Sequence, residues 1–424
     1  MTPGVSISAP RPLLGISAKS RDMLESPKRR QIDPTAGLDG RKSRLDLTRA
    51  SGSFLYDAKK QAADQTRVVW CHRGVQTRSG EAGIYRRLDG GGARMTGIIR
   101  CGSVWTCPTC ALPVSEKRRE ELAAGMVEWT NSGGHVYLMT LTFPHERTDE
   151  LSTLMVKLTK ALTRFRTGRA YRGVRDRFGV VGAVRALEAT HGQNGWHPHL
   201  HFLVFGKPGL LDDDEARDTL RNAWLQCLDK AGLLPANKAE DAALHSFDIR
   251  GGDQAADYIS KFGRDQKFGM SSEVTRHMAK VGARGLAEFS GHVTPFQILE
   301  WAAKGDTLAV SLWREFAPVF TGKRQLVYTA GLKKKLGIDD LTDDEIANDD
   351  SERPAEEMVG NMTGAQLAIL HSRRALGEFL DNVARYGGGQ NDIDDWIAFI
   401  EQRPKVSSGT LIDRGEFVKW PQAA

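Results

Sequence analysis

Residues 196–205 read WHPHLHFLVF, and this stretch decides the fold prediction. Its second half has the apolar character of a β-strand, on which successive side chains alternate between the two faces. His199 and His201 lie two residues apart and therefore share one face of that strand. Two imidazoles on one rigid face can bind a metal ion, although polar histidines on the wet face of an antiparallel sheet have the same spacing.

The segments around this strand alternate between strand and helix patterns. Their order, β-α-β-β-α-β-α, predicts an α+β fold with a split βαβ core, in which helices cover an antiparallel central sheet. The expected elements are strands at 135–143, 178–189, 200–205 and 245–249 and helices at 151–165, 212–231 and 254–262.

The turn between the two central strands determines which residues lie opposite the histidines. Residues 194–195, Asn-Gly, are typical of a two-residue hairpin turn in which both residues have positive φ. With the turn at this position, Glu188 pairs with His201 and Thr190 pairs with His199. Glu188 then lies on the same face as the two histidines.

This register predicts a metal site made of His199, His201 and Glu188. Two imidazoles and one carboxylate suit Mg²⁺ or Mn²⁺ when phosphate oxygens and water complete the coordination shell. His197 has the same strand parity and is a candidate for supporting the ligands. The alternative is a cross-strand Glu–His pair at the surface.

Composition and charge point to a partner with many phosphates. The chain has 424 residues, room for two or three domains, with 40% hydrophobic and 26% charged residues. Prolines interrupt the first residues, and the chain contains no run of 18 apolar residues. These features predict a cytoplasmic protein that does not bind or cross a membrane. The formal net charge of the whole chain is +6. Residues 339–357 carry a net charge of −9, so the remaining residues carry +15. Such a basic body favours nucleic acid as a partner.

The cysteines predict a structural zinc site. Five cysteines are an odd number, which argues against a secreted disulfide framework. Cys107 and Cys110 form a C-x₂-C pair, with Cys101 and Cys71 upstream. Four thiolates make a closed tetrahedral Zn²⁺ site, in which His72 is an alternative to the adjacent cysteine. A redox-active C-x₂-C pair is the competing interpretation.

Residues 157–185 contain nine Lys and Arg side chains against one acidic residue, with Phe165 and Tyr171 among them. Cations neutralise phosphates and aromatic rings stack on unpaired bases, so the pattern favours a DNA-binding surface over a solvated helix face. The side chains expected to contact DNA are Lys160, Arg164, Arg166, Arg169 and Arg172.

The helix expected after the last core strand carries a candidate nucleophile. Tyr258 and Lys261 are three residues apart and so lie on one helix face. A phenol with a pKa of about 10 is a poor nucleophile at neutral pH. A nearby ammonium group and a phosphate polarised by a metal ion would make its attack feasible, whereas ordinary amphipathic packing is the alternative reason for the spacing.

Taken together, these motifs resemble the three ordered motifs of rolling-circle replication initiators in the HUH endonuclease superfamily. The matching segments are 138–144 (LMTLTFP), 199–204 (HLHFLV) and 258–261 (YISK). Residues 101–110 (CGSVWTCPTC) resemble the cysteine motif of plasmid Rep proteins in that group. The resemblance covers roughly residues 70–335, including the TPFQ segment at 294–297 and GKRQL at 322–326.

This resemblance implies that Tyr258 nicks one strand at a plasmid double-strand origin. The tyrosine stays attached as a 5′-phosphotyrosine and frees a 3′-OH for a host DNA polymerase. Family members end the replication cycle with a second tyrosine, or with an acidic residue that activates water and often lies one helical turn before the tyrosine. Gln254 occupies that position here, and Asp253 and Asp257 are the nearest acids. The chain has no G-x₄-G-K-[ST] motif, so unwinding is expected from a host helicase.

Two other functions fit the same motifs: an HUH-type transposase, and a zinc-dependent DNA-binding regulator without catalysis. Single-strand cleavage would exclude the regulator. The predicted division of the chain is a disordered basic segment (1–60), a cysteine-rich zinc-binding module (61–130), the HUH nuclease core (131–265), a helical extension (266–337), an acidic linker (338–358) and a helical C-terminal tail (359–424).

Overall fold

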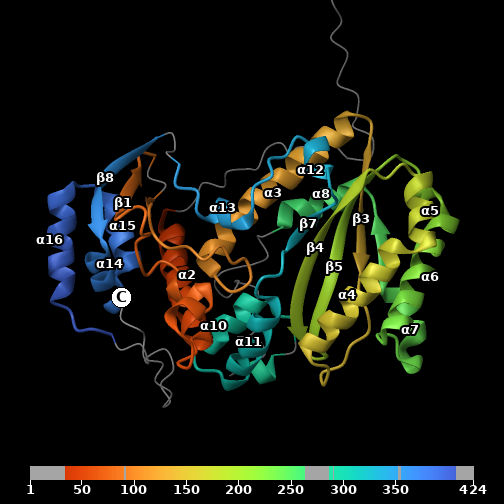
Figure 1. Ribbon diagram of the computed structural model, residues 1–424, viewed down its shortest axis with the longest axis horizontal. Helices are drawn as coiled ribbons and strands as arrows, with labels where there is room; N and C mark the ends of the chain where they lie inside the picture. Colours follow the sequence, from red (N-terminus) through yellow and green to blue (C-terminus); the bar gives the residue numbers. More distant parts are fainter. Residues whose placement is uncertain (1–33, 90–91, 263–285, 290, 352–354, 407–424) are drawn as a thin grey trace, which may run out of the picture.

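The computed structural model describes residues 34–89, 92–262, 286–289, 291–351 and 355–406 (Figure 1). Its larger sheet consists of five antiparallel strands, β3 (His135–Leu141), β4 (Gly182–Gly192), β5 (Gly195–Gly206), β6 (Phe247–Arg250) and β7 (Leu326–Tyr328). Their spatial order is β6-β3-β5-β4-β7. Because β5 is inserted between β3 and β4, the sheet has the split βαβ arrangement, and the predicted α+β class is confirmed.

The order of elements along the core follows the sequence prediction. Helix α4 (Leu151–Thr167) connects β3 to β4, α6 (Asp214–Ala231) follows β5, and α8 (Gly252–Lys261) follows β6. Two helices were not predicted, α5 (Arg169–Arg177) and α7 (Ala239–His245). Both are short, and the dense charge of α5 hides its apolar spacing.

Helices cover both faces of this sheet (Figure 1). On one face, α4 and α6 pack over even-numbered residues of β5 such as Phe202 and Val204. On the other face, α8 and the C-terminal half of α3 (Pro108–Asn131) pack over Leu203 and Phe205. The odd-numbered histidines of β5 therefore lie on the face that carries α3 and α8.

The hairpin register differs from the prediction by two residues. Glu188 lies opposite His199, not opposite His201. The turn is at residues 193–194, and Gly195, with φ of 83°, is the only residue of this hairpin loop in the left-handed region. This geometry matches a turn closed by a left-handed glycine, not the expected turn with two positive φ angles. A two-residue shift preserves the face, so Glu188 still shares its side of the sheet with the histidines.

The prediction of disorder over residues 1–60 is wrong for its second half. Pro34–Leu55 forms helix α2, and Leu47, Ala50 and Phe54 are buried in the main core beside the cysteine module. The helix is stabilised by tertiary packing that its Ser-, Gly- and Arg-rich sequence does not reveal. The part of the segment before Pro34 lies outside the described residues.

The extension after residue 265 also contains a strand. Helices α10 (Pro295–Ala303) and α11 (Thr307–Phe320) were expected, and α12 (Leu332–Lys335) adds one turn. Strand β7 nevertheless joins the core sheet as an edge strand beside β4. Three residues are too few for a periodic strand signal. The portion of the extension from 266 to 285 lies outside the described residues.

The C-terminal region is not simply a helical tail. Its strand β8 (Glu356–Thr363) pairs with β1 (Glu81–Arg87), which also pairs with β2 (Ala93–Met95), so the two ends of the chain share a second antiparallel sheet. Three helices pack on this sheet around a separate apolar core (Figure 1). They are α14 (Gly364–Ser372), α15 (Leu376–Tyr386) and α16 (Gln390–Glu401).

The acidic segment at 338–358, called the strap below, is folded in its described residues where a linker was predicted. It contains helix α13 (Asp343–Ala347), whose Thr342 side chain caps the helix N-terminus. Its carboxylates pair with arginines of the cysteine module, of β2 and of α3, which explains why so many acids gather here. The pairs are Arg67–Asp344, Arg94–Glu356, Arg100–Asp350 and Arg118–Asp343.

We expect Arg118→Ala to lower the free energy of unfolding by about 3–5 kcal/mol, because it leaves buried acidic groups without their cation. The Arg118 guanidinium binds Asp343, Glu121 and the carbonyl of Leu341, and its side chain is 8% exposed. Urea unfolding would measure the change. The matched control is Arg67→Ala, which removes a pair with a 63% exposed side chain and should cost below about 1 kcal/mol. Equal, small losses in the two variants would contradict the strap's structural role.

Short 3₁₀ turns complete the described elements at Ala62–Asp64, Arg67–Trp70, Leu210–Asp212, Ala236–Lys238 and Leu286–Glu288. Within the described ranges, every helix is too short or too polar to cross a membrane.

Candidate active site

Three side chains from the two central strands form the first candidate metal group. Glu188 on β4 faces His199 across the hairpin, and His201 lies two residues further along β5. Glu188 Oε2 is 3.4 Å from His199 Nε2 and 3.7 Å from His201 Nε2. The ligand atoms of the three residues all lie within 4.8 Å of one another, so one ion could contact them all.

The backs of both imidazoles are held by hydrogen bonds. His199 Nδ1 lies 3.1 Å from the carbonyl oxygen of His197. A carbonyl only accepts, so Nδ1 carries a proton, and Nε2 is the nitrogen directed toward Glu188, to which it donates a hydrogen bond when the ring is protonated. Loss of the Nε2 proton would free this nitrogen to bind a metal ion. His201 Nδ1 lies 3.0 Å from Thr140 Oγ1 on the neighbouring strand β3. This support is the arrangement that orients histidine ligands in metal sites.

The charges of the group favour an anionic carboxylate. Burial alone would raise the pKa of Glu188, but the hydrogen bond from His199 and the charges of His201 and His199 lower it to about 2. Burial would likewise lower the pKa of His199, yet the hydrogen bond and charge of Glu188 raise it above its usual value. Burial lowers the pKa of His201 to about 4. The donor set therefore consists of the imidazoles of His201 and His199 and the anionic carboxylate of Glu188. Two imidazoles and one carboxylate suit a divalent cation.

Tyr258 lies directly against this group. Its hydroxyl donates a 2.7 Å hydrogen bond to Glu188 Oε1, and its ring packs on His201 with centroids 4.8 Å apart. Burial, followed by the negative charge of Glu188, raises the pKa of Tyr258 well above its usual value. The phenol is therefore protonated in this arrangement, and a bound cation would act in the opposite direction.

Lys261 does not lie at the metal group as Tyr258 does. Its ammonium group lies 2.8 Å from Asp257 Oδ2, and its side chain is 57% exposed. Helix α8 thus directs Tyr258 toward the sheet and Lys261 toward an acid on the outer side. Gln254 lies one turn before Tyr258 on the same helix, as expected from the sequence, and is exposed.

A second pair of histidines extends the site: His197 was expected to support the ligands, whereas His145 was missed by the sequence analysis. His197 Nδ1 lies 3.3 Å from His145 Nδ1, while His197 Nε2 lies 3.1 Å from Thr142 Oγ1. Burial and the surrounding histidines lower the pKa of His197 to about 3. His197 supports His199 through its carbonyl, and its own ring is directed to a loop residue. His145 follows the predicted strand 135–143 by two residues, which was the available signal.

The four predicted cysteines form the second candidate metal group. Cys71, Cys101, Cys107 and Cys110 are all buried, with sulfur atoms within 4.8 Å of one another. They come from a 3₁₀ turn, a loop and the start of α3. Hydrogen bonds among the four thiols lower the pKa of Cys110 well below its usual value and raise the pKa values of Cys71 and Cys101 well above theirs. This donor set fits Zn²⁺, and His72 does not belong to it.

We expect Cys107→Ser to reduce bound zinc from about one ion per chain to nearly none, with loss of soluble protein. Cys107 Sγ also caps α3 by accepting a hydrogen bond from the Cys110 amide. Serine is a good N-cap, so the substitution keeps the cap and removes only the thiolate. Elemental analysis measures the metal, with Cys227→Ser, on the half-buried face of α6, as the control. Zinc-free wild-type protein would refute the site.

The basic side chains expected to bind DNA are exposed, but they lie on the opposite face of the sheet from the histidines. They project from α4 and α5, whereas the histidines face α3 and α8. Phe165 is fully buried against Trp224, so its expected role as a stacking ring is wrong, while Tyr171 is only half-buried. The exposed cations are Lys160, Arg164, Arg166, Arg169 and Arg172.

Comparison with known proteins identifies the family of the chain. A family model described as a replication protein matches residues 94–231, which span the C-x₂-C pair and both core histidines and end before Tyr258. The chain belongs to the Rep family of replication proteins, the plasmid replication initiators. A relative from Streptomyces lividans, "Protein rep", is 31% identical over 320 residues, or 60% of this chain and 68% of that protein.

A second relative, "Neomycin resistance protein" of Streptomyces cyanogenus, is 36% identical over 146 residues. The match covers 28% of this chain and 33% of that protein. No solved structure matches the chain.

Proposed function

We propose that this replication protein nicks one strand of its plasmid origin through Tyr258 in rolling-circle replication. The observation that carries the proposal is the 2.7 Å hydrogen bond from the Tyr258 hydroxyl to Glu188, the carboxylate that also faces His199 and His201. A nucleophile and a metal-binding group thus meet from segments far apart in the sequence. An ordinary packing tyrosine has no need of this position.

His199, His201 and Glu188 would hold Mg²⁺ or Mn²⁺, which would polarise the scissile phosphate. The oxygen of Tyr258 attacks the phosphorus, the P–O3′ bond breaks, and the leaving 3′ oxygen takes a proton from solvent water to become the 3′-OH. The phenolic proton leaves along the hydrogen bond toward Glu188 Oε1. The 5′ phosphate remains joined to Tyr258 as a phosphotyrosine.

The free 3′-OH serves a host DNA polymerase, while a host helicase separates the strands. The proposed substrate is single-stranded at the nick, in keeping with the resemblance to rolling-circle initiators. A second transesterification later rejoins the strand. Gln254 cannot act as a general base in that step, so activation of the terminating nucleophile falls to another group. Lys261 could neutralise charge at the scissile phosphate if its pair with Asp257 opens.

The test incubates purified full-length protein with labelled fragments of the DNA that flanks its own gene, with Mn²⁺ or with EDTA. We expect one strand to be cut at one position, with a 3′ end that a polymerase extends and a 5′ end that carries protein. A DNA-binding regulator would leave the fragments intact. Cutting at palindromic or inverted ends without an origin would indicate a transposase.

A further inference from the structure

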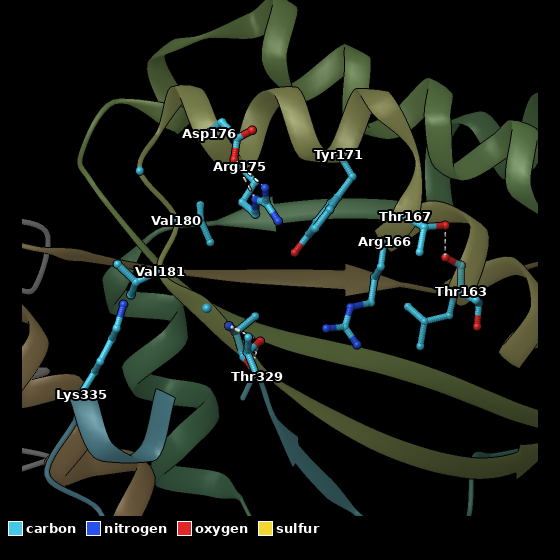
Figure 2. A pocket seen from close by; sticks show the side chains of 14 residues that line it. Thr163, Arg166, Thr167, Tyr171, Arg175, Asp176, Val180, Val181, Thr329 and Lys335 are labelled. Atoms are coloured by element: carbon cyan, nitrogen blue, oxygen red, sulfur yellow. Dashed lines mark hydrogen bonds and ion pairs between the residues drawn. The ribbon is translucent and has the colours of Figure 1, made fainter. Parts of the chain in front are cut away.

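A cleft of about 790 Å³ opens where α4 and α5 meet the beginning of β4 and the segment after β7 (Figure 2). Its volume is within the roughly 300–1,000 Å³ of small-ligand sites. Figure 2 shows Arg166, Tyr171 and Arg175 directed from the two helices toward the strands, with Thr329 on the other side and Lys335 at the margin.

The charge of this cleft is positive. Arg175 pairs with Asp176, the one acid among the lining residues. Arg166 and Lys335 form no ion pair with any residue in the described part of the chain. Burial, and then the charge of Arg166, lower the pKa of nearby Arg185 to about 10, so cations already repel one another here. An anionic ligand would relieve that repulsion.

One wall of the cleft offers an aromatic ring. Tyr171 packs against Phe165 with ring centroids 5.1 Å apart, which fixes its orientation. The lining also includes the apolar residues Val180, Gly182 and Ala183. A planar, partly apolar group that carries a negative charge would match this combination of aromatic ring, apolar lining and cations.

We propose that this cleft binds an unpaired nucleotide of single-stranded DNA, with its base against Tyr171 and its phosphates at Arg166 and Lys335. The proposal rests on the proposed function, because it assumes that origin DNA is the partner. A base within a duplex cannot reach a half-buried ring. The exposed Arg169 and Arg172 continue the positive surface along α5 and give the adjoining phosphates further cations.

The cleft is separate from the nicking site. Ala183 at the cleft and Glu188 are five residues apart on β4, which corresponds to about 17 Å along a strand. Their side chains also point to opposite faces of the sheet. One nucleotide therefore cannot occupy both places, and a bound strand would pass around the edge formed by β7. The cleft would hold DNA flanking the nick without touching the scissile phosphate.

The first test measures binding of a short fluorescein-labelled oligothymidine to full-length protein by anisotropy, in EDTA so that no strand is cut. We expect the double variant Arg166→Ala/Lys335→Ala to bind about 10-fold more weakly. The control, Arg221→Ala/Lys304→Ala, removes the same charge from exposed positions outside the cleft and should stay within about twofold. Equal losses in the two variants, or none, would overturn the proposal.

The second test maps contacts with an oligonucleotide that contains 5-iodouracil. Photocrosslinking should place an adduct on the peptide that contains Tyr171, and unlabelled oligothymidine should suppress it. Adducts only on other peptides would overturn the proposal, as would equal suppression by free dTMP, which would make the ligand a free nucleotide. Both readouts are independent of cleavage. Loss of nicking with these results intact would refute the proposed function alone, and nicking without them would refute the cleft alone.

Discussion

Tyr258→Phe should abolish the covalent protein–DNA adduct, with a loss of nicking on the order of 10⁴-fold or more, as for other removed nucleophiles. The substitution deletes one oxygen and keeps the ring that packs on His201 and Phe262. The folded structure loses only the hydrogen bond to Glu188. Denaturing electrophoresis of labelled origin DNA after the reaction measures the adduct directly.

The matched control for this experiment is Tyr328→Phe. Tyr328 pairs with Val184 on the same face of the sheet as Glu188. Val184 and Glu188 are four residues apart along β4, or about 13 Å, which is too far for direct attack at the metal group. We therefore expect normal nicking by Tyr328→Phe and an adduct on the peptide containing Asp257 and Tyr258. An adduct on the Tyr328 peptide would show that Tyr328, and not Tyr258, is the nucleophile.

Removing either histidine ligand should have the second largest effect. We expect His199→Ala and His201→Ala each to abolish Mn²⁺-dependent nicking while origin binding remains near the wild-type level. In the proposed mechanism the two imidazoles would hold the metal ion at the reacting phosphate, whereas affinity for DNA would come mainly from cations elsewhere. Nicking and gel-shift assays on the same preparations separate the two properties. His245→Ala, at a 72% exposed position on α7, is the control.

Glu188→Ala tests the third ligand. It should weaken the apparent affinity for Mn²⁺ by about 10–100-fold, the usual effect of a supporting group in a metal site. A titration of nicking against Mn²⁺ concentration gives this value. An unchanged titration would exclude Glu188 as a ligand, and full nicking by the His199→Ala/His201→Ala double variant would exclude the metal site itself.

The core fold and its ligand group were predictable because they depend on local periodicity. The β-α-β-β-α-β-α order follows from residue spacing, and the face of Glu188 follows from strand parity. The turn was placed one residue too late, which changes the pairing register by two residues, and strand parity survives a register shift of two. The cysteine group was predictable because three of its ligands, Cys101, Cys107 and Cys110, are close in sequence.

Other features depend on contacts that no local pattern encodes. The acidic segment resembles a solvated linker until Arg118 and Arg100 are placed beside it. Helix α2 has little amphipathic character and needs the cysteine module as its partner. The sequence also did not show that the sheet separates the basic helices from His199, because spacing along the chain does not reveal which face of a sheet a connecting helix covers.

The second sheet can be completed only late in synthesis, because β8 is far from β1 in the sequence. Arg94 on β2 and Glu356 on β8, which form an ion pair between the outer strands of this sheet, are 262 residues apart. At about 5–20 residues per second, a ribosome needs roughly 13–50 s to deliver the second after the first. Until then β1 has an unpaired edge, which is a site for aggregation. Strands β3 to β6 and helix α8 emerge earlier, so we expect a nascent chain to contain His199, His201 and Tyr258 before strand β8 completes the second sheet.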